Sequence, residues 1–160
     1  WRMTEMQAAI GRVQLRKLDH WVGQRRSNAV FLAERLRGIH GVEVSIPERD
    51  FFHSYYKFYL ALDASALAEG WARDRIVEEV NVAGMPCLAG ICPEMYRERA
   101  FATAGLGPAS PLPVASDLGG RSMLLLVHPT ITAGELQAYA DVVAEVLLKS
   151  LKKSARGGVR

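Results

Sequence analysis

Apolar residues recur every three or four positions in several stretches of the chain, which is the spacing of one face of a helix. The first stretch predicts a helix over residues 4–18. Thr4 and Gln7 have the spacing of a capping box, in which each side chain satisfies a free amide of the first turn. The apolar line of this helix is Met6, Ala9, Ile10 and Val13.

The same spacing predicts three more helices. One lies in residues 25–38 with Gly38 as its C-cap, and one lies in residues 66–84 and ends at Gly84. The last begins at Thr132, which forms a second capping box with Glu135. The apolar lines are Ala29, Leu32 and Leu36, then Ile76, Val77, Val80 and Ala83, and finally Leu136, Ala140, Val143, Leu147 and Leu151.

Strand patterns lie between these helices. Residues 41–47 and 53–62 alternate or are rich in aromatic residues, and residues 123–129 form a continuous apolar run of the buried kind. Residues 85–101 indicate a short strand, a loop and one helical turn over 93–99. Residues 102–115 read as a proline-rich loop, and residues 116–122 as a short helix at best.

This order of elements predicts an α/β fold of the α+β kind, with a small, mostly antiparallel sheet flanked by helices. We expect three parts: linking helices in residues 1–38, a small α/β domain in residues 39–151, and a basic tail in residues 152–160 that is disordered.

Composition narrows the functional classes. The chain is 49% hydrophobic and 23% charged, with a net charge of +3, which is too weak to argue for nucleic acid. The apolar run of residues 123–127, which no other run in the sequence exceeds, is far shorter than a membrane span. Cys87 and Cys92 have no zinc-ligand spacing and no metal-binding cluster around them, so we expect idle thiols in a reducing cytoplasm.

No self-contained active site is visible in the sequence, but two histidines lie at the edges of predicted strands. His53 and His128 can each present a donor and an acceptor to a ligand, or can be satisfied by a neighbouring carbonyl. In a strand over 53–62, His53, Tyr55, Lys57 and Tyr59 share one face. That face suits a polar or anionic ligand, although strand tyrosines also serve as the rim of a core.

The opening residues resemble a signature of the DegT/StrS-type sugar aminotransferases, which depend on pyridoxal phosphate. The family pattern is matched by Arg2, Met3, Glu5, Gln7, Ala8, Ala9, Ile10, Gly11, Gln14 and Leu15. Further matches are "HSYYKFY", "GMPCLAGICPEMYRERAF", "LPVA" and "HPT". The resemblance covers nearly the whole chain and implies the small C-terminal domain of a fold-type I enzyme, cut away from the large domain that carries the Schiff-base lysine.

The resemblance also implies roles for single residues. Arg2 matches a family arginine near the dimer interface and is expected to hold cofactor phosphate or donor carboxylate, or else to form a structural ion pair. His53, Tyr55, Lys57, Tyr96 and His128 are the expected substrate contacts. Tyr96 and Glu98 replace a His and a Gln of many members, and Leu126 replaces a Pro, which suggests a different sugar pocket.

The resulting hypothesis is a domain of an aminotransferase that acts on a keto-sugar nucleotide in surface-polysaccharide or amino-sugar biosynthesis. It would line the substrate cleft and the dimer interface, with the missing N-terminal domain, a second subunit and an amino-acid donor as partners. We expect no catalytic residue in this chain, no pyridoxal phosphate bound to it alone, no nucleic-acid partner and no membrane contact. The alternatives are a freestanding small-ligand-binding α/β regulatory module and, through the basic tail, a nucleic-acid binder.

Overall fold

A four-stranded sheet forms the centre of the computed structural model, which describes residues 2–90 and 92–152. The strands are β1 (Val42–Val44), β2 (Phe58–Leu62), β3 (Cys87–Ala89) and β4 (Ser122–Leu125), in the order β1-β2-β4-β3. Every pair of strands in the described residues is antiparallel, and Leu60 of β2 stands opposite both Val44 and Met123. The predicted antiparallel sheet with flanking helices is therefore confirmed.

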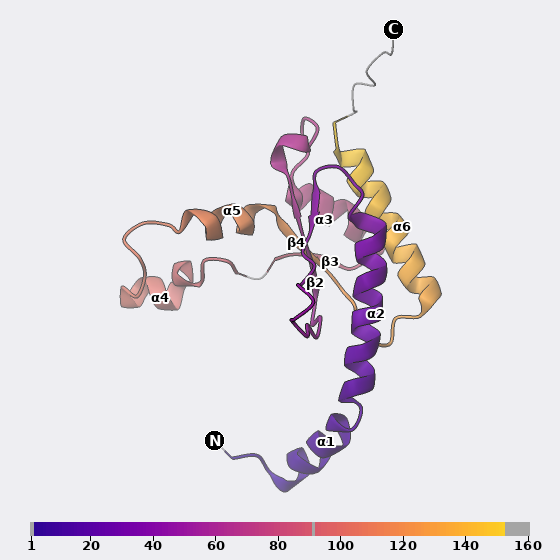
Figure 1. Cartoon of the computed structure of the whole chain (residues 1–160). Coiled ribbons are helices and arrows are strands. Elements are labelled where there is room, and N and C mark those ends of the chain that lie inside the picture. The colour runs from indigo at the N-terminus through magenta and orange to yellow at the C-terminus, as the bar shows by residue number, and fades with distance from the viewer. Residues whose placement is uncertain (1, 91, 153–160) are drawn as a thin grey trace.

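Three helices cover one face of this sheet: α2 (Leu18–Leu36), α3 (Arg73–Val82) and α6 (Ala133–Ser150) (Figure 1). Burial alternates along β2, so that Phe58, Leu60 and Leu62 point into the core while Tyr59 and Ala61 lie on the other face. The apolar lines predicted for the helices supply the opposite side of the core, and Leu32, Leu36 and Leu147 are completely buried. A short 3₁₀ turn, η1 (Ala64–Ala66), follows β2.

The first helix, α1 (Glu5–Leu15), leads away from the sheet (Figure 1). Both hydrogen bonds of the predicted capping box form between Thr4 and Gln7. None of the residues of α1 is buried, and its apolar line is exposed, with Ile10 at 56%. The second helix begins at Leu18, after only a brief turn that follows Leu15, so it continues almost directly from the first helix.

An arm extends from the other side of the sheet and carries η2 (Met95–Arg97), α4 (Arg99–Ala104) and α5 (Pro113–Arg121) (Figure 1). The prediction of a loop over residues 102–115 is wrong at both of its ends. Gly105 adopts a left-handed conformation that ends α4. Pro113 is the first residue of α5, where the backbone N–H that proline lacks would have no partner within the helix. Pro113 therefore begins a helix, whereas Pro108 and Pro111 lie in the loop ahead of it.

Two predicted strands are shorter in the structure. The strand expected over 53–62 occupies only Phe58–Leu62, because Tyr55 has a left-handed backbone with a φ of 47° that an extended strand cannot contain. The strand expected over 123–129 is Ser122–Leu125. Gly84 ends α3 with a φ of 84°, as expected, whereas Gly38 lies outside the left-handed region and Arg37 caps α2.

Two further expectations concern membranes and metals. Within residues 2–90 and 92–152, no helix combines the length and apolar character needed to cross a bilayer. The same residues bring together no group of three His, Cys, Asp or Glu side chains suited to a metal ion. The expected basic tail lies outside the described residues, apart from Lys152.

Candidate functional site

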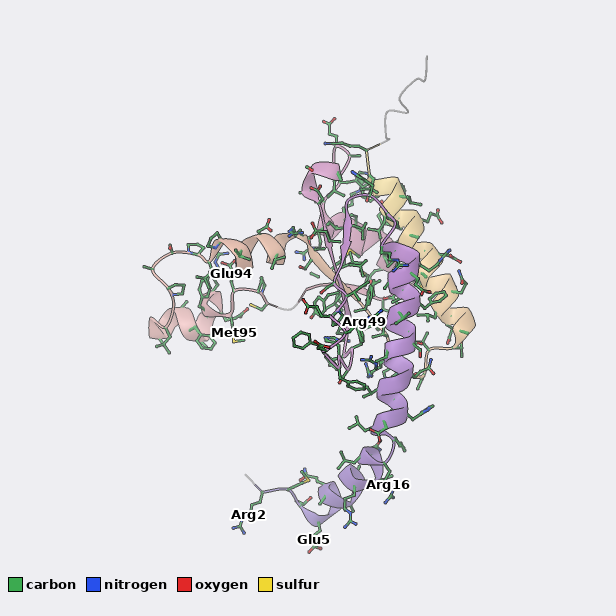
Figure 2. All side chains as sticks on the ribbon, in the orientation of Figure 1. Arg2, Glu5, Arg16, Arg49, Glu94 and Met95 are labelled. Atoms are coloured by element: carbon green, nitrogen blue, oxygen red, sulfur yellow. The ribbon has the colours of Figure 1, made fainter. Side chains whose placement is uncertain are left out.

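A groove of about 640 Å³ lies between α2 and the segment that connects β1 to β2. Val30, Phe31 and Ile46 give it an apolar floor. Its polar side chains are Arg26, Ser27, Glu34, Glu48, Arg49, His53 and Tyr55. Arg49 projects from the connecting segment on the side of α2 (Figure 2). The groove therefore combines two guanidinium groups with an imidazole and a phenol, which suits a ligand with anionic and hydroxyl groups.

His53 and Tyr55 are held together by a local turn. The backbone N–H of Tyr55 donates to Nδ1 of His53 at 3.1 Å. The two rings meet edge to face, with centroids 4.4 Å apart and planes inclined at 71°. The imidazole thus closes the turn that gives Tyr55 its left-handed backbone, and both side chains line the groove.

The structure separates the remaining members of the predicted strand face. Lys57 lies outside the groove, with its amine 5.1 Å from the centre of the Tyr56 ring. Tyr59 lies on β2 in a different hollow of about 300 Å³, beside Leu118 and Ser122. The prediction that His53, Tyr55, Lys57 and Tyr59 share one strand face is wrong, because the turn at Tyr55 interrupts the alternation.

Tyr96 lies on the arm, and its hydroxyl forms hydrogen bonds to other residues of the arm. Its hydroxyl donates to Oε1 of Glu94 and accepts the backbone N–H of Leu112 at 2.9 Å. The Glu94 carboxylate raises the pKa of Tyr96, and the hydroxyl in turn lowers the pKa of Glu94. Glu94 and Met95 mark the position of this cluster on the arm (Figure 2), so the structure does not bring Tyr96 to the groove.

His128 lines a third hollow, of about 430 Å³, together with Met85, Ile131 and Tyr139. Its Nδ1 lies 2.8 Å from the hydroxyl of Thr130. The hydrogen-bond partner of this ring is therefore a hydroxyl and not the carbonyl that the sequence offered as an alternative to a ligand. Arg2 is exposed ahead of α1, at the end of that helix remote from the sheet (Figure 2). The substrate and cofactor contacts expected of these two residues remain predictions.

Sequence reasoning did not identify the arginines of the groove. Arg26 comes from α2 and Arg49 from the connecting segment, 23 positions further along the sequence numbering. The paired letters "RR" of residues 25–26, within a helix that is otherwise apolar on its inner face, could have signalled Arg26, but they say nothing of Arg49. Nothing in the pattern shows which segment packs over that pair.

The lysines of the described residues do not fit the part of a pyridoxal phosphate site that forms a Schiff base. Lys149 donates to Glu79 at 3.0 Å, and Lys152 donates to the backbone oxygen of Ser65 at 2.7 Å. Lys17 lies exposed with its amine 5.6 Å from the centre of the Trp21 ring. Neither these lysines nor Lys57 lines the groove or the two hollows described above, so we assign no step of transamination to them.

Solved structures of aminotransferases superpose on nearly the whole of this chain. The chain is 37% identical to the aminotransferase from Psychrobacter cryohalolentis, whose X-ray structure superposes with a TM-score of 0.85 over 94% of this chain and 40% of that one. The Helicobacter pylori aminotransferase PseC, involved in the biosynthesis of pseudoaminic acid, shares the fold at 18% identity, with a TM-score of 0.79 over 93% of this chain and 38% of that one.

A curated relative gives a similar picture. The erythromycin biosynthesis sensory transduction protein EryC1 of Saccharopolyspora erythraea is 29% identical over 133 residues, which are 82% of this chain and 33% of that protein. The chain thus spans between a third and two fifths of the length of these relatives. The model of one family matches residues 1–146. The chain therefore belongs to the DegT/DnrJ/EryC1/StrS aminotransferase family.

Proposed function

We propose that this chain is the small C-terminal domain of a pyridoxal phosphate-dependent aminotransferase that acts on a keto sugar linked to a nucleotide. The match of the family model to residues 1–146 carries this proposal, and the superposition on 40% of the Psychrobacter cryohalolentis enzyme supports it. In such an enzyme the preceding domain supplies the lysine and most cofactor contacts. The cofactor would supply the electron sink of transamination.

The groove defines the contribution that we propose for this domain. Arg26 and Arg49 offer planar donors that match the oxygens of a phosphate. His53 and Tyr55 offer hydrogen bonds to hydroxyl groups. Glu34 and Glu48 on the same groove offset part of the positive charge, so the site favours a ligand that carries hydroxyls as well as phosphate.

The domain assignment can be tested with a chimera. The aligned portion of the Psychrobacter cryohalolentis aminotransferase, 40% of that chain, is replaced by residues 1–152 of this chain, and transamination is measured with the substrates of that enzyme. We expect a folded chimera with measurable activity, because the two domains share their fold, with a TM-score of 0.85. A folded chimera that binds pyridoxal phosphate but shows no activity above a truncated enzyme would contradict the proposed role.

The ligand class can be tested on the chain itself. Thymidine diphosphate and uridine diphosphate are titrated into ¹⁵N-labelled protein, and amide shifts are followed by NMR. We expect shifts at groove residues and an affinity that is weaker by about tenfold or more in Arg49→Gln, since one charge-assisted contact is worth about 1.5–3 kcal/mol and about 1.4 kcal/mol corresponds to a factor of ten. Arg37→Gln, an exposed arginine at the end of α2, is the matched control. Shifts confined to residues outside the groove would overturn this ligand site.

A further inference from the structure

Two neighbouring arginines of α2 form hydrogen bonds to the backbone of the turn that carries His53 and Tyr55. Nη1 of Arg26 donates to the backbone oxygen of His53 at 2.8 Å, and Nη1 of Arg25 donates to the backbone oxygen of Tyr56 at 3.0 Å. The two accepting carbonyls stand on either side of Tyr55. Consecutive residues of one helix thus hold both ends of the turn.

Each guanidinium also lies against an aromatic ring of the same segment. The Arg26 guanidinium is 4.3 Å from the centre of the Phe52 ring, and that of Arg25 is 5.9 Å from the centre of the Tyr56 ring. Both arginines are half-buried, so their side chains are confined on α2 rather than moving freely in solvent. The arginine pair therefore fixes residues 52–56 from outside the segment.

The backbone between these two points has a conformation that requires support. Tyr55 has a φ of 47°, which residues with a side chain rarely adopt without surrounding contacts that impose it. Within the segment, the contacts that favour it are the hydrogen bond from its N–H to Nδ1 of His53 and the edge-to-face contact of the two rings. The arginine contacts add the long-range part of this support.

The turn fixes the hydrogen-bonding character of His53. Because Nδ1 accepts the Tyr55 N–H, a neutral imidazole carries its hydrogen on Nε2. The ring then presents a donor, and the Tyr55 hydroxyl lies on the same groove as either donor or acceptor. A ligand with acceptor oxygens would meet a defined set of donors, whereas a relaxed turn would present a mixture of tautomers.

We propose that Arg25 and Arg26 are positioning residues, whose grip on the carbonyls of His53 and Tyr56 sets the turn at Tyr55 and the Nε2–H tautomer of His53. The effect of this device on ligand affinity rests on the proposed function of the groove. Its effect on the turn does not, because it is a property of the chain without ligand.

The test uses residues 1–160. Imidazole ¹⁵N shifts report the tautomer of His53, and hydrogen exchange of the Tyr55 amide reports the turn. We expect a single Nε2–H form in the parent protein. In Arg25→Gln/Arg26→Gln we expect mixed tautomers and loss of Tyr55 amide protection by about tenfold or more, since a local opening changes exchange without global unfolding. Arg26→Lys, which keeps a positive charge, should retain more of the single tautomer and of the Tyr55 protection than Arg26→Gln does. Arg37→Gln should change neither signal.

Global stability separates positioning from a merely structural role. Urea unfolding should shift little in the single variants, whose contacts lie at the surface of α2, while the tautomer and exchange signals still change. If the double variant fails to fold, the two single Gln variants and Arg26→Lys decide the question. Unchanged tautomer and unchanged Tyr55 exchange in folded variants would overturn the proposal.

Thymidine diphosphate titration keeps the two proposals distinct. A parent chain that binds no diphosphate, with variants that lose the turn and the single tautomer, would refute the ligand site and support the positioning role of the two arginines. A parent chain that binds diphosphate, with variants that keep the turn and the tautomer, would refute the grip alone. If both hold, Arg25→Gln, whose side chain does not line the groove, should bind the diphosphate several-fold more weakly than Arg37→Gln.

Discussion

The side-chain amide of Asn28 donates a hydrogen bond of 3.1 Å to the backbone oxygen of His128, which lies 100 positions later in the chain. Asn28 is only 2% exposed, and its own oxygen accepts from Gln24 at 2.9 Å. One buried amide on α2 therefore ties the helix layer to the segment that follows β4.

Replacement of Asn28 by alanine should destabilise the protein by about 1–3 kcal/mol, because it leaves a carbonyl without its partner near the core. Urea unfolding monitored by circular dichroism measures the change. Gln24→Ala, which removes only the outer bond of the pair, is the control and should cost less. Equal losses in the two variants would show that the bond to His128 adds nothing.

Gly41 should not tolerate a side chain. It has a φ of 75°, and a Cβ added there would lie 2.5 Å from Cβ of Ala66. Gly41→Ala should therefore cost about 1–2 kcal/mol from the left-handed backbone, with the steric overlap adding to that figure. Gly38→Ala, three positions earlier and with no neighbouring atom within 4 Å, is the matched control and should be close to neutral. Thermal unfolding of both variants makes the comparison.

The arm should loosen in acid. The Tyr96 hydroxyl, with Ser116 and Arg97, lowers the pKa of Glu94 below its ordinary value of 4.5. Because the folded pKa is the lower one, the stabilising contribution is complete above the unfolded value and is lost as the pH falls through the folded value. Exchange of the Leu112 amide, which donates to Tyr96, should accelerate relative to core amides below about pH 4.5. Glu94→Gln should flatten this dependence, and an unchanged profile would contradict the role of the carboxylate.

The two cysteines should differ in reactivity. Burial raises the pKa of Cys87 to about 12. Cys92 is exposed, although its hydrogen bond to Glu98 raises the pKa of the thiol. A disulfide reagent should therefore label one thiol per native chain, slowly, and both after denaturation. Cys92→Ser should abolish the native reaction, whereas labelling that persists in this variant would place Cys87 within reach of solvent.

The exposed line of α1 should promote self-association. Met6 and Ile10 of α1 are 75% and 56% exposed, as is Met3 just ahead of the helix at 69%, and burial of one such side chain is worth about 1.5–3 kcal/mol. Light scattering over a concentration series should show an apparent mass that rises with concentration. Ile10→Asp should reduce the rise, and Gln14→Asp, which adds the same charge at a polar position of the helix, should reduce it less. A strictly monomeric parent chain would refute the prediction.

The sequence by itself determined the first helix, the three helices that cover the sheet, two of the N-caps and the class of sheet. Thr4 with Gln7 and Thr132 with Glu135 mark two helix starts, because a capping box is completed within one turn. The apolar lines identified which side of each covering helix is buried, since helical period is also a local property. The family signature, read from the opening residues and four later blocks, is confirmed by the family match over residues 1–146.

The tertiary structure decided what the local pattern of residues 53–59 becomes. Alternation in this segment is consistent with a strand, but Arg25 and Arg26 reach it from a helix some thirty positions earlier and hold it as a turn. The Tyr96 hydroxyl is held by Glu94 and by the backbone amide of Leu112, which lies 16 positions later in the chain. Periodicity records only the neighbours that a residue has within a few positions, and these side chains take their conformation from partners that folding brings in from elsewhere in the chain.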